Sequence, residues 1–362
     1  MSVLITGISG FVGKKLLSLI KDQKQTTFYL LLRGKTFLKY KKELKRYSHL
    51  RPVKGHLLHP DLFADDEDYD ECREKVDTII HLAGIYDLSA KKKDLYMGNV
   101  LGTQNVVFFA SQVNNLKKFI HASSIAIAGD HEGEFKETDY DLGQSFSNAY
   151  AETKFEAEGV VRNFSHSYKS VQTDILRFGI IIGDSCTGKY EKIDGPYIFL
   201  HKLNLPLEGI KKMIKLSKYP LPALFLLPYN QHSQLAVVPV DFIASSLLKI
   251  MSSRGRGNRT FHLISKNTPT LKTFLEDYLS TIELKGTIKE IPESNIFKSS
   301  LRKVAPYLNI PRSYIDYMYS KTLITAGNYP KVIGAELPDY NDYKKVFLKM
   351  AYVTIKSGKI KK

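Results

Sequence analysis

The first twenty residues constrain the fold of this chain more than any other stretch. The apolar run Val3–Thr6 leads directly into three glycines spaced three apart (Gly7, Gly10 and Gly13), and a helical pattern follows to Ile20. A strand that enters a helix through a glycine turn offers free backbone N–H groups and the positive end of the helix dipole to an anion. The stretch therefore predicts a turn that binds the pyrophosphate of a dinucleotide.

The glycine turn does not by itself identify an enzyme. Its spacing is GxxGxxG, whereas the general dinucleotide fingerprint is GxGxxG. A strand, turn and helix without any ligand is the alternative interpretation, and the remainder of the chain has to decide between the two.

The first half of the chain alternates short apolar runs with helical patterns, which predicts βαβ units. Runs such as Thr78–Leu82 are nearly continuously apolar, which is typical of strands whose two faces are both covered. The fold class we predict is α/β, a doubly wound parallel Rossmann sheet whose ligand lies beyond the carboxyl ends of the strands. The predicted strands are Val3–Thr6, Thr27–Leu32, Arg51–Lys54, Thr78–Leu82, Lys118–Ala122 and Thr173–Phe178, and the predicted helices are Gly13–Lys21, Asp66–Glu74, Leu95–Asn114 and Asn148–Ser165.

The composition changes after Ile182. Residues 183–234 are rich in Gly, Pro and Lys, whereas 235–241, 242–252 and 261–264 read as a strand, a helix and a strand that return to the first core. The last hundred residues are tyrosine-rich and helical in pattern. We predict an NAD(P)-binding Rossmann domain from 1–182 plus 235–265, and a smaller, mostly helical substrate-binding cap from 183–234 plus 266–362.

Cysteine usage and apolar runs narrow the class of protein. Cys72 and Cys186 have no CxxC or Cys/His spacing, so we expect neither a disulfide framework nor a metal site. The first strand begins too early for a secretory signal, and no apolar run reaches the roughly 18–20 residues of a membrane-spanning helix. A cytoplasmic protein is expected.

The formal net charge of +16 is unevenly distributed. Between Arg33 and Lys54 there are nine Lys or Arg residues against one acid, Glu43. Such a patch suits nucleic acid, an anionic membrane, or an anionic cofactor or substrate, and a solvated lysine-rich surface is the alternative. No nucleic-acid-binding motif accompanies the charge, so no nucleic-acid partner is expected.

Tyr150 and Lys154 lie four residues apart on a predicted helix, and therefore on one face. A phenol has a pKa near 10, and a neighbouring ammonium lowers that pKa toward the range useful for acid–base chemistry. Ser123 and Ser124 end a predicted strand, where a hydroxyl can hold a substrate carbonyl. The alternatives are an ordinary helix face and a serine turn.

Together these features resemble the extended short-chain dehydrogenase/reductase superfamily, over roughly residues 2–265. The thioester reductase and fatty acyl-CoA reductase (male-sterility-like) branch is the most similar, on Leu31–Gly34, Gly183–Gly188 and the terminal helical stretch Leu337–Tyr352. The segments that carry the superfamily resemblance are Thr6–Gly13, Asp77–Gly84, Asn99–Thr103, Ser123–Ser124, Tyr150–Lys154 and Arg177–Gly183.

The resemblance implies a role for each matching residue. Tyr150 is the general acid/base, Lys154 lowers its pKa and holds the nicotinamide ribose, and Ser124 binds the carbonyl. Ser124 is preferred to Ser123 because Gly129 follows it as in the family's Ser-x-x-x-Tyr-Gly pattern, with Ala128 replacing the aromatic residue. The implied cofactor-binding residues are Gly7, Ser9, Gly10, Phe11, Val12, Gly13, Arg33, His56, Leu57, Leu82, Ala83, Gly84, Asn99, Tyr150, Lys154, Phe178, Gly179 and Ile180.

The end of the second strand decides between the two nicotinamide cofactors. An acid there binds the ribose hydroxyls of NAD, but this chain has Arg33 and Lys35 and no acid. A guanidinium suits a 2′-phosphate, so NADPH is favoured over NAD. His56 stands where many relatives have an aspartate beside the adenine.

The expected activity is NADPH-dependent hydride transfer to a carbonyl or acyl thioester of a hydrophobic, lipid- or polyketide-like substrate, carried on coenzyme A or a carrier. A hydroxysteroid-dehydrogenase-like or dihydroflavonol-reductase-like enzyme, an NAD-dependent nucleotide-sugar epimerase or dehydratase, and a non-catalytic NADP(H) sensor are the alternatives. A homodimer is compatible with the sequence. Lysines 211, 212 and 215 beside the apolar run 219–228 suit peripheral membrane contact or a cap packed on the sheet domain.

Overall fold

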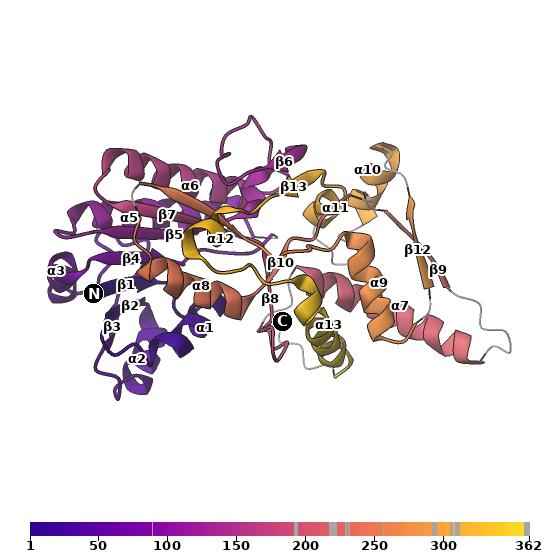
Figure 1. Cartoon of the computed structure of the whole chain (residues 1–362), viewed down its shortest axis with the longest axis horizontal. Coiled ribbons are helices and arrows are strands. Elements are labelled where there is room, and N and C mark those ends of the chain that lie inside the picture. Colours follow the sequence, from indigo (N-terminus) through magenta and orange to yellow (C-terminus); the bar gives the residue numbers. More distant parts are fainter. Residues whose placement is uncertain are drawn as a thin grey trace.

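The fold is built on a seven-stranded, all-parallel sheet with the order β11-β7-β5-β4-β1-β2-β3 (Figure 1). The structure is a computed structural model that describes residues 1–88, 90–191, 195–216, 223–228, 230, 232–255, 257–284, 286–291, 295–304, 307 and 312–357. The strands of this sheet are β1 (Ser2–Thr6), β2 (Thr27–Leu32), β3 (Leu50–Lys54), β4 (Thr78–His81), β5 (Lys118–Ser124), β7 (Gln172–Phe178) and β11 (Arg259–Leu263).

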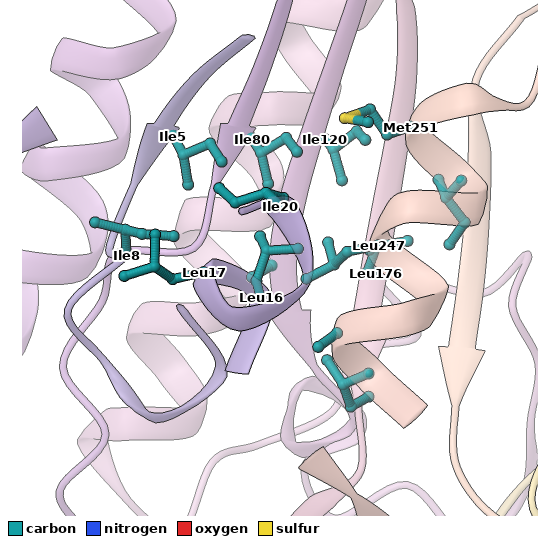
Figure 2. Packing of buried hydrophobic residues seen from close by; sticks show 14 of the residues in the cluster. Ile5, Ile8, Leu16, Leu17, Ile20, Ile80, Ile120, Leu176, Leu247 and Met251 are labelled. Carbon is teal, nitrogen blue, oxygen red and sulfur yellow. The ribbon is translucent and has the colours of Figure 1, made fainter. Parts of the chain in front are cut away.

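Helices cover both faces of the sheet, and the alternation of strand side chains decides which residues they meet. Ile5 of β1 and Ile80 of β4 point into the cluster under α1 (Phe11–Ile20) and α8 (Val240–Ser252), as Figure 2 shows. Their neighbours Leu4 and Ile79 point into the cluster on the opposite face. The opposite face is covered by α3 (Asp66–Lys75), α5 (Gly102–Gln112) and α6 (Ala149–Ser167).

The order of the strands places a ligand crevice at the carboxyl edge between β1 and β4. The chain moves outward from β1 to β2 and β3, with α2 (Gly34–Glu43) before β3, and then returns to β4 on the other side of β1. The loops that follow β1 and β4 diverge there and leave a crevice, the common ligand position in open parallel sheets. The α/β, doubly wound prediction is confirmed.

Most of the remaining elements lie at the end of the molecule away from the N-terminus and α3 (Figure 1). Two-stranded parallel pairs form between β8 and β10, β9 and β12, and β6 and β13. Their strands are β6 (Gly133–Phe135), β8 (Ile180–Ile182), β9 (Ala223–Pro228), β10 (Val237–Pro239), β12 (Gly286–Ile291) and β13 (Thr322–Ile324). The further helices are α7 (Pro196–Leu216), α9 (Leu271–Thr281), α10 (Asn295–Val304), α11 (Arg312–Met318), α12 (Asn328–Ile333) and α13 (Tyr340–Lys356).

The predicted division into a Rossmann domain and a cap stays a prediction. A second buried cluster joins α7, α9 and α13, as a cap of its own would require. Tyr329 and Leu337, which the division assigns to the cap, are instead buried in the same cluster as α1 and α8.

Some element boundaries differ from those predicted. The helix predicted over 95–114 is three pieces: α4 (Lys92–Leu95), the π-helical turn η1 (Tyr96–Leu101) and α5. The π turn shifts the register of the backbone just where Asn99 has to face the crevice, and π turns are frequent at functional sites. Helix α2, which the lysine-rich pattern obscured, was not predicted.

Two findings bear on membranes. Among the described residues, no helix combines the length and the apolarity needed to cross a bilayer. Residues 217–222 and 229 lie outside the described residues, as do the side chains of 210–216 and 223–228. The predicted membrane contact of this segment therefore stays a prediction.

Candidate active site

Glycine is required at two positions of the turn between β1 and α1. Gly7 has a φ of +80°, and a Cβ there would lie 2.5 Å from the backbone nitrogen of Ala83. A Cβ on Gly13 would lie 2.3 Å from the carbonyl oxygen of Gly7. Any side chain at either position would push the turn away from β4 or from α1, so both glycines hold the loop closely against its neighbours.

The N-terminus of α1 is available to an anion. Gly10 is the N-cap residue, no side chain caps the helix, and the first turn contains no acidic residue. Its first N–H groups therefore meet no carboxylate from the helix's own first turn in competition with a ligand phosphate. The turn and this helix end together fit the pyrophosphate of a dinucleotide.

The three proposed catalytic residues come from two adjacent elements and face one cavity. Ser124 ends β5, and Tyr150 and Lys154 lie on the first turns of α6. The Asn148 side chain accepts a hydrogen bond from the N–H of Ala151 at 2.9 Å and so starts α6 just before the tyrosine. The Tyr86 ring meets that of Tyr150 edge to face, with centroids 5.0 Å apart.

The two serines at the end of β5 have different partners. Ser123 donates a hydrogen bond to Oε2 of the buried Glu158 at 2.6 Å. Among the described residues, the one hydrogen bond of the Ser124 hydroxyl is the 3.2 Å bond that it accepts from the N–H of Ala126, so its own proton can point into the cavity. The hydrogen-bond pattern therefore favours Ser124 as the residue that binds a carbonyl.

Lys154 is buried beside the strand that carries the serines. Its Nζ donates to the carbonyl oxygen of Ala122 at 2.5 Å. Burial lowers the pKa of Lys154 to about 8, and Glu158 opposes that change. The ammonium is thus positioned at the floor of the cavity, one helical turn from Tyr150.

Asn99 makes hydrogen bonds to two elements that line the cavity. Its Oδ1 accepts from the N–H of Ile85 at 2.7 Å, and its Nδ2 donates to the carbonyl oxygen of Ile85 and to Oγ1 of Thr153. It therefore fixes the segment after β4 against α6, and the π-helical turn brings it there.

A single cavity of about 650 Å³ runs from the glycine turn to α9, α10 and α11. It brings together most of the predicted site residues, from elements far apart in the sequence. Those that line it are Gly7, Gly10, Phe11, Val12, Gly13, Leu82, Gly84, Asn99, Ser124, Tyr150, Lys154, Phe178, Gly179 and Ile180, and those that do not are Ser9, Arg33, His56, Leu57 and Ala83.

The residues outside the cavity lie on the segments that follow β1, β2, β3 and β4 at the carboxyl edge of the sheet. Arg33 is exposed at the carboxyl end of β2, where it is the N-cap residue of α2. His56 is exposed just after β3, and its Nδ1 accepts from the N–H of Leu58 at 3.0 Å. Leu57 is half-buried under α5, where its carbonyl oxygen accepts from Nδ2 of Asn105, and the N–H of Ala83 donates to Oγ1 of Thr6.

A buried ion-pair network behind the site was not predicted from the sequence. Glu158 and Arg177 are both fully buried, and Nη2 of Arg177 donates to Oε1 of Glu158 at 2.7 Å. Arg177 also meets Nε2 of His262, whose Nδ1 donates to the carbonyl oxygen of Thr325 at 2.6 Å. The spacing from Lys154 places Glu158 on the same helix face, but no local pattern identifies a partner on β7.

No group of three or more His, Cys, Asp or Glu residues in the described part of the chain could hold a metal ion. The free thiols Cys72 and Cys186 belong to different environments, one buried and one exposed.

Comparison with known proteins points to one family. The family model described as male sterility protein matches residues 5–247. A linear gramicidin synthase polypeptide from Brevibacillus parabrevis is 26% identical over 302 residues, which are 79% of this chain and 5% of that protein. Fatty acyl-CoA reductase 1 from Xenopus laevis is 28% identical over 158 residues, 38% of this chain and 30% of that protein. This chain thus matches only a minor part of either relative.

Solved structures share the fold at low sequence identity. The terminal R domain of the myxalamid PKS-NRPS pathway has a TM-score of 0.74 and 20% identity, over 98% of this chain and 91% of that one. MoeE5 in complex with UDP-glucuronic acid and NAD has a TM-score of 0.62 and 16% identity, over 98% and 99%. Both reductase-type and nucleotide-sugar-binding proteins therefore share this architecture.

Proposed function

The chain belongs to the male sterility protein family of extended short-chain dehydrogenase/reductases, and we propose that it is an NADPH-dependent reductase of acyl thioesters with an apolar acyl group. The relatives called fatty acyl-CoA reductase and terminal R domain support the thioester part of the proposal. Either coenzyme A or a carrier would bring the acyl group.

The charge of the cavity carries the proposal about the substrate. Among the described residues that line it, Lys154 is the one charged side chain, and the part near α9 and α11 is formed by residues such as Phe274, Ile315 and Met318. A nucleotide sugar would bring a diphosphate that needs cations. The described lining at this end has polar groups such as Tyr314, Tyr317 and Gln234, but none of them is charged. An uncharged, apolar acyl chain matches the lining instead.

The residues at the crevice fit a dinucleotide. The turn at Gly7–Gly13 would hold the pyrophosphate, Lys154 the nicotinamide ribose, and Arg33 the 2′-phosphate. When bound, NADPH supplies the hydride that reduces the carbonyl carbon. Asn99 would keep the segment after β4 in the position that lies along it.

The chain's own residues would handle the oxygen and its proton. Ser124 would donate a hydrogen bond to the thioester carbonyl, and Tyr150 would transfer its phenolic proton to that oxygen as the hydride reaches the carbon. The product is a hemithioacetal. When the C–S bond breaks, Tyr150 would take the hydroxyl proton back and the thiolate would leave, which gives an aldehyde and, after protonation, a thiol.

The cofactor preference can be tested at Arg33. We expect Arg33→Ala to raise the KM for NADPH by about 10–100-fold, because one charge-assisted contact to the 2′-phosphate is lost. The KM for NADH should stay within about 2-fold. Lys39→Ala is the control, since Lys39 lies on α2 but pairs with Glu43. Equal changes for both cofactors would contradict the assignment.

The function itself is tested by following NADPH absorbance with acyl-CoA thioesters of increasing chain length, with pantetheine thioesters, and with UDP-sugars. We expect oxidation of NADPH and release of a free thiol in equal amounts with the acyl thioesters alone. Consumption of NADPH by ketones without any thiol release would favour a steroid- or flavonol-type reductase. Turnover of UDP-sugars with bound NAD would refute the proposal.

A further inference from the structure

A buried histidine beneath the active site has no part in the chemistry described above. His121 lies on β5 and is 1% exposed, and neither of its ring nitrogens has a hydrogen-bond partner among the described residues. Buried polar atoms nearly always have a partner, either in the protein or in an ordered water molecule. The imidazole of His121 therefore calls for such a partner close by.

The neighbouring histidine cannot be that partner. His81 lies opposite His121 in the register of β4 and β5, with ring centroids 5.4 Å apart. Its Nδ1 is 2.7 Å from Oγ1 of Thr6 and its Nε2 is 3.0 Å from Oγ1 of Thr103, so both nitrogens are engaged. Of these two adjacent, fully buried imidazoles, His81 has hydrogen-bond partners for both ring nitrogens, whereas His121 has none among the described residues.

Lys154 has N–H donors that make no hydrogen bond with the described residues. A lysine ammonium has three N–H donors, and the bond to the carbonyl oxygen of Ala122 is the one hydrogen bond that its Nζ makes with the described residues. Ala122 directly follows His121 in the strand. In the proposed mechanism a second donor serves the nicotinamide ribose, and the third remains.

Charge and burial keep His121 in the form that can accept a hydrogen bond. Burial lowers the pKa of His121 well below its usual value, and the charge of Lys154 adds to this. The ring is therefore neutral, with one nitrogen as donor and the other as acceptor.

We propose that His121 is a positioning residue, which through one buried water molecule holds the ammonium of Lys154 in the orientation that supports Tyr150. The water accepts a hydrogen bond from Nζ of Lys154 and donates one to the acceptor nitrogen of His121. The role rests on the proposed function, because it acts through Lys154 on the proton transfer by Tyr150.

The role predicts a change in pH dependence. The titratable groups around Lys154 are Tyr150 and Glu158 on α6, His81 on β4 and His121 on β5. The Lys154 ammonium is present below its pKa and is lost as pH rises through it. In His121→Leu the water loses its acceptor and the ammonium is less stabilised, so its pKa falls further. The basic limb of kcat should move down by about one pH unit.

Two variants separate this role from a purely structural one. His121→Gln keeps a side-chain acceptor and should restore the basic limb to within about 0.3 pH unit of the wild type, a fraction of the shift expected from one lost bond. His49→Leu is the control, because His49 is also a buried histidine, bonded through Nε2 to the carbonyl oxygen of Ile20. It should lower the melting temperature and leave the pH profile unchanged. An unchanged profile in folded His121→Leu would overturn the proposal.

A crystal structure of the wild-type enzyme tests the same role without any variant. A water molecule should lie within about 3.2 Å of both Nζ of Lys154 and a ring nitrogen of His121. Its absence from a high-resolution map would overturn the proposal even if no variant folds. This water can be observed even if no substrate is found in the screen. Failure of the proposed function is therefore distinguishable from failure of this inference.

Discussion

Replacing Tyr150 with phenylalanine should lower kcat for acyl thioester reduction by about 10²–10⁴-fold, the range for loss of a general acid. The phenolic proton is the one that the proposed mechanism transfers to the carbonyl oxygen, and Phe has none. The ring can keep its edge-to-face contact with Tyr86, so the cavity should keep its shape. Initial rates of NADPH oxidation measure the loss, and fluorescence titration should show NADPH affinity within about 2-fold of the wild type, because no cofactor charge contact is removed.

The matched control is Tyr86→Phe, at the other ring of the same pair. Tyr86 is exposed at the cavity and has no assigned proton transfer, so its kcat should stay within about 3-fold of the wild type. If Tyr150→Phe retained full turnover on every accepted substrate, the mechanism would be wrong. If neither variant nor wild type oxidised NADPH with any substrate, the non-catalytic sensor would be the better interpretation.

Replacing Arg177 with methionine should lower the free energy of unfolding by about 3–5 kcal/mol, because it leaves the carboxylate of Glu158 buried without its cation. Both side chains have an exposed fraction of 0%. Arg162 still reaches Oε1 of Glu158 at 2.8 Å, but it is itself partly exposed and cannot replace the buried partner. Urea denaturation followed by circular dichroism measures the change.

The pH dependence identifies the cause of this loss. Burial acts to raise the pKa of Glu158, but Arg177, together with Arg162 and the hydrogen bond from Ser123, holds that pKa below its usual range. The ion pair therefore stabilises the fold above the pKa of the unfolded chain, and this contribution is lost as pH falls through the lower, folded value. The difference in the free energy of unfolding between Arg177→Met and wild type should become smaller at acidic pH. If that difference did not depend on pH, the loss of stability would come from lost packing rather than from the ion pair.

Two further variants serve as controls for Arg177→Met. Lys92→Met removes an exposed ion pair with Glu152, and it should lower the free energy of unfolding far less than Arg177→Met does. The double variant Arg177→Met with Glu158→Met removes both charges and should recover part of the loss, as buried pairs replaced together usually do.

Much of the sheet could be predicted because its signals are local. Alternating apolar runs such as Thr27–Leu32 and Thr78–His81 are strands in the structure, within one or two residues of the predicted ends. The helix over 95–114 could not be predicted in detail, because a π turn gains its stability from the contacts of Asn99 with distant segments rather than from propensity. Helix α2 was obscured because its buried face is narrow: Tyr40 is its one fully buried residue.

Local patterns in the sequence were enough to predict the glycine turn and the parallel sheet. The resemblance to a family was enough to assign expected roles to Ser124, Tyr150 and Lys154. The tertiary structure was needed to show that Ser123 donates to Glu158 while Ser124 faces the cavity, and that Lys154 is the one charged side chain among the described residues of the cavity lining. It also decided the position of His121 beside Lys154. These features are contacts between β5, α6 and distant elements, and no pattern along one segment specifies how such surfaces meet.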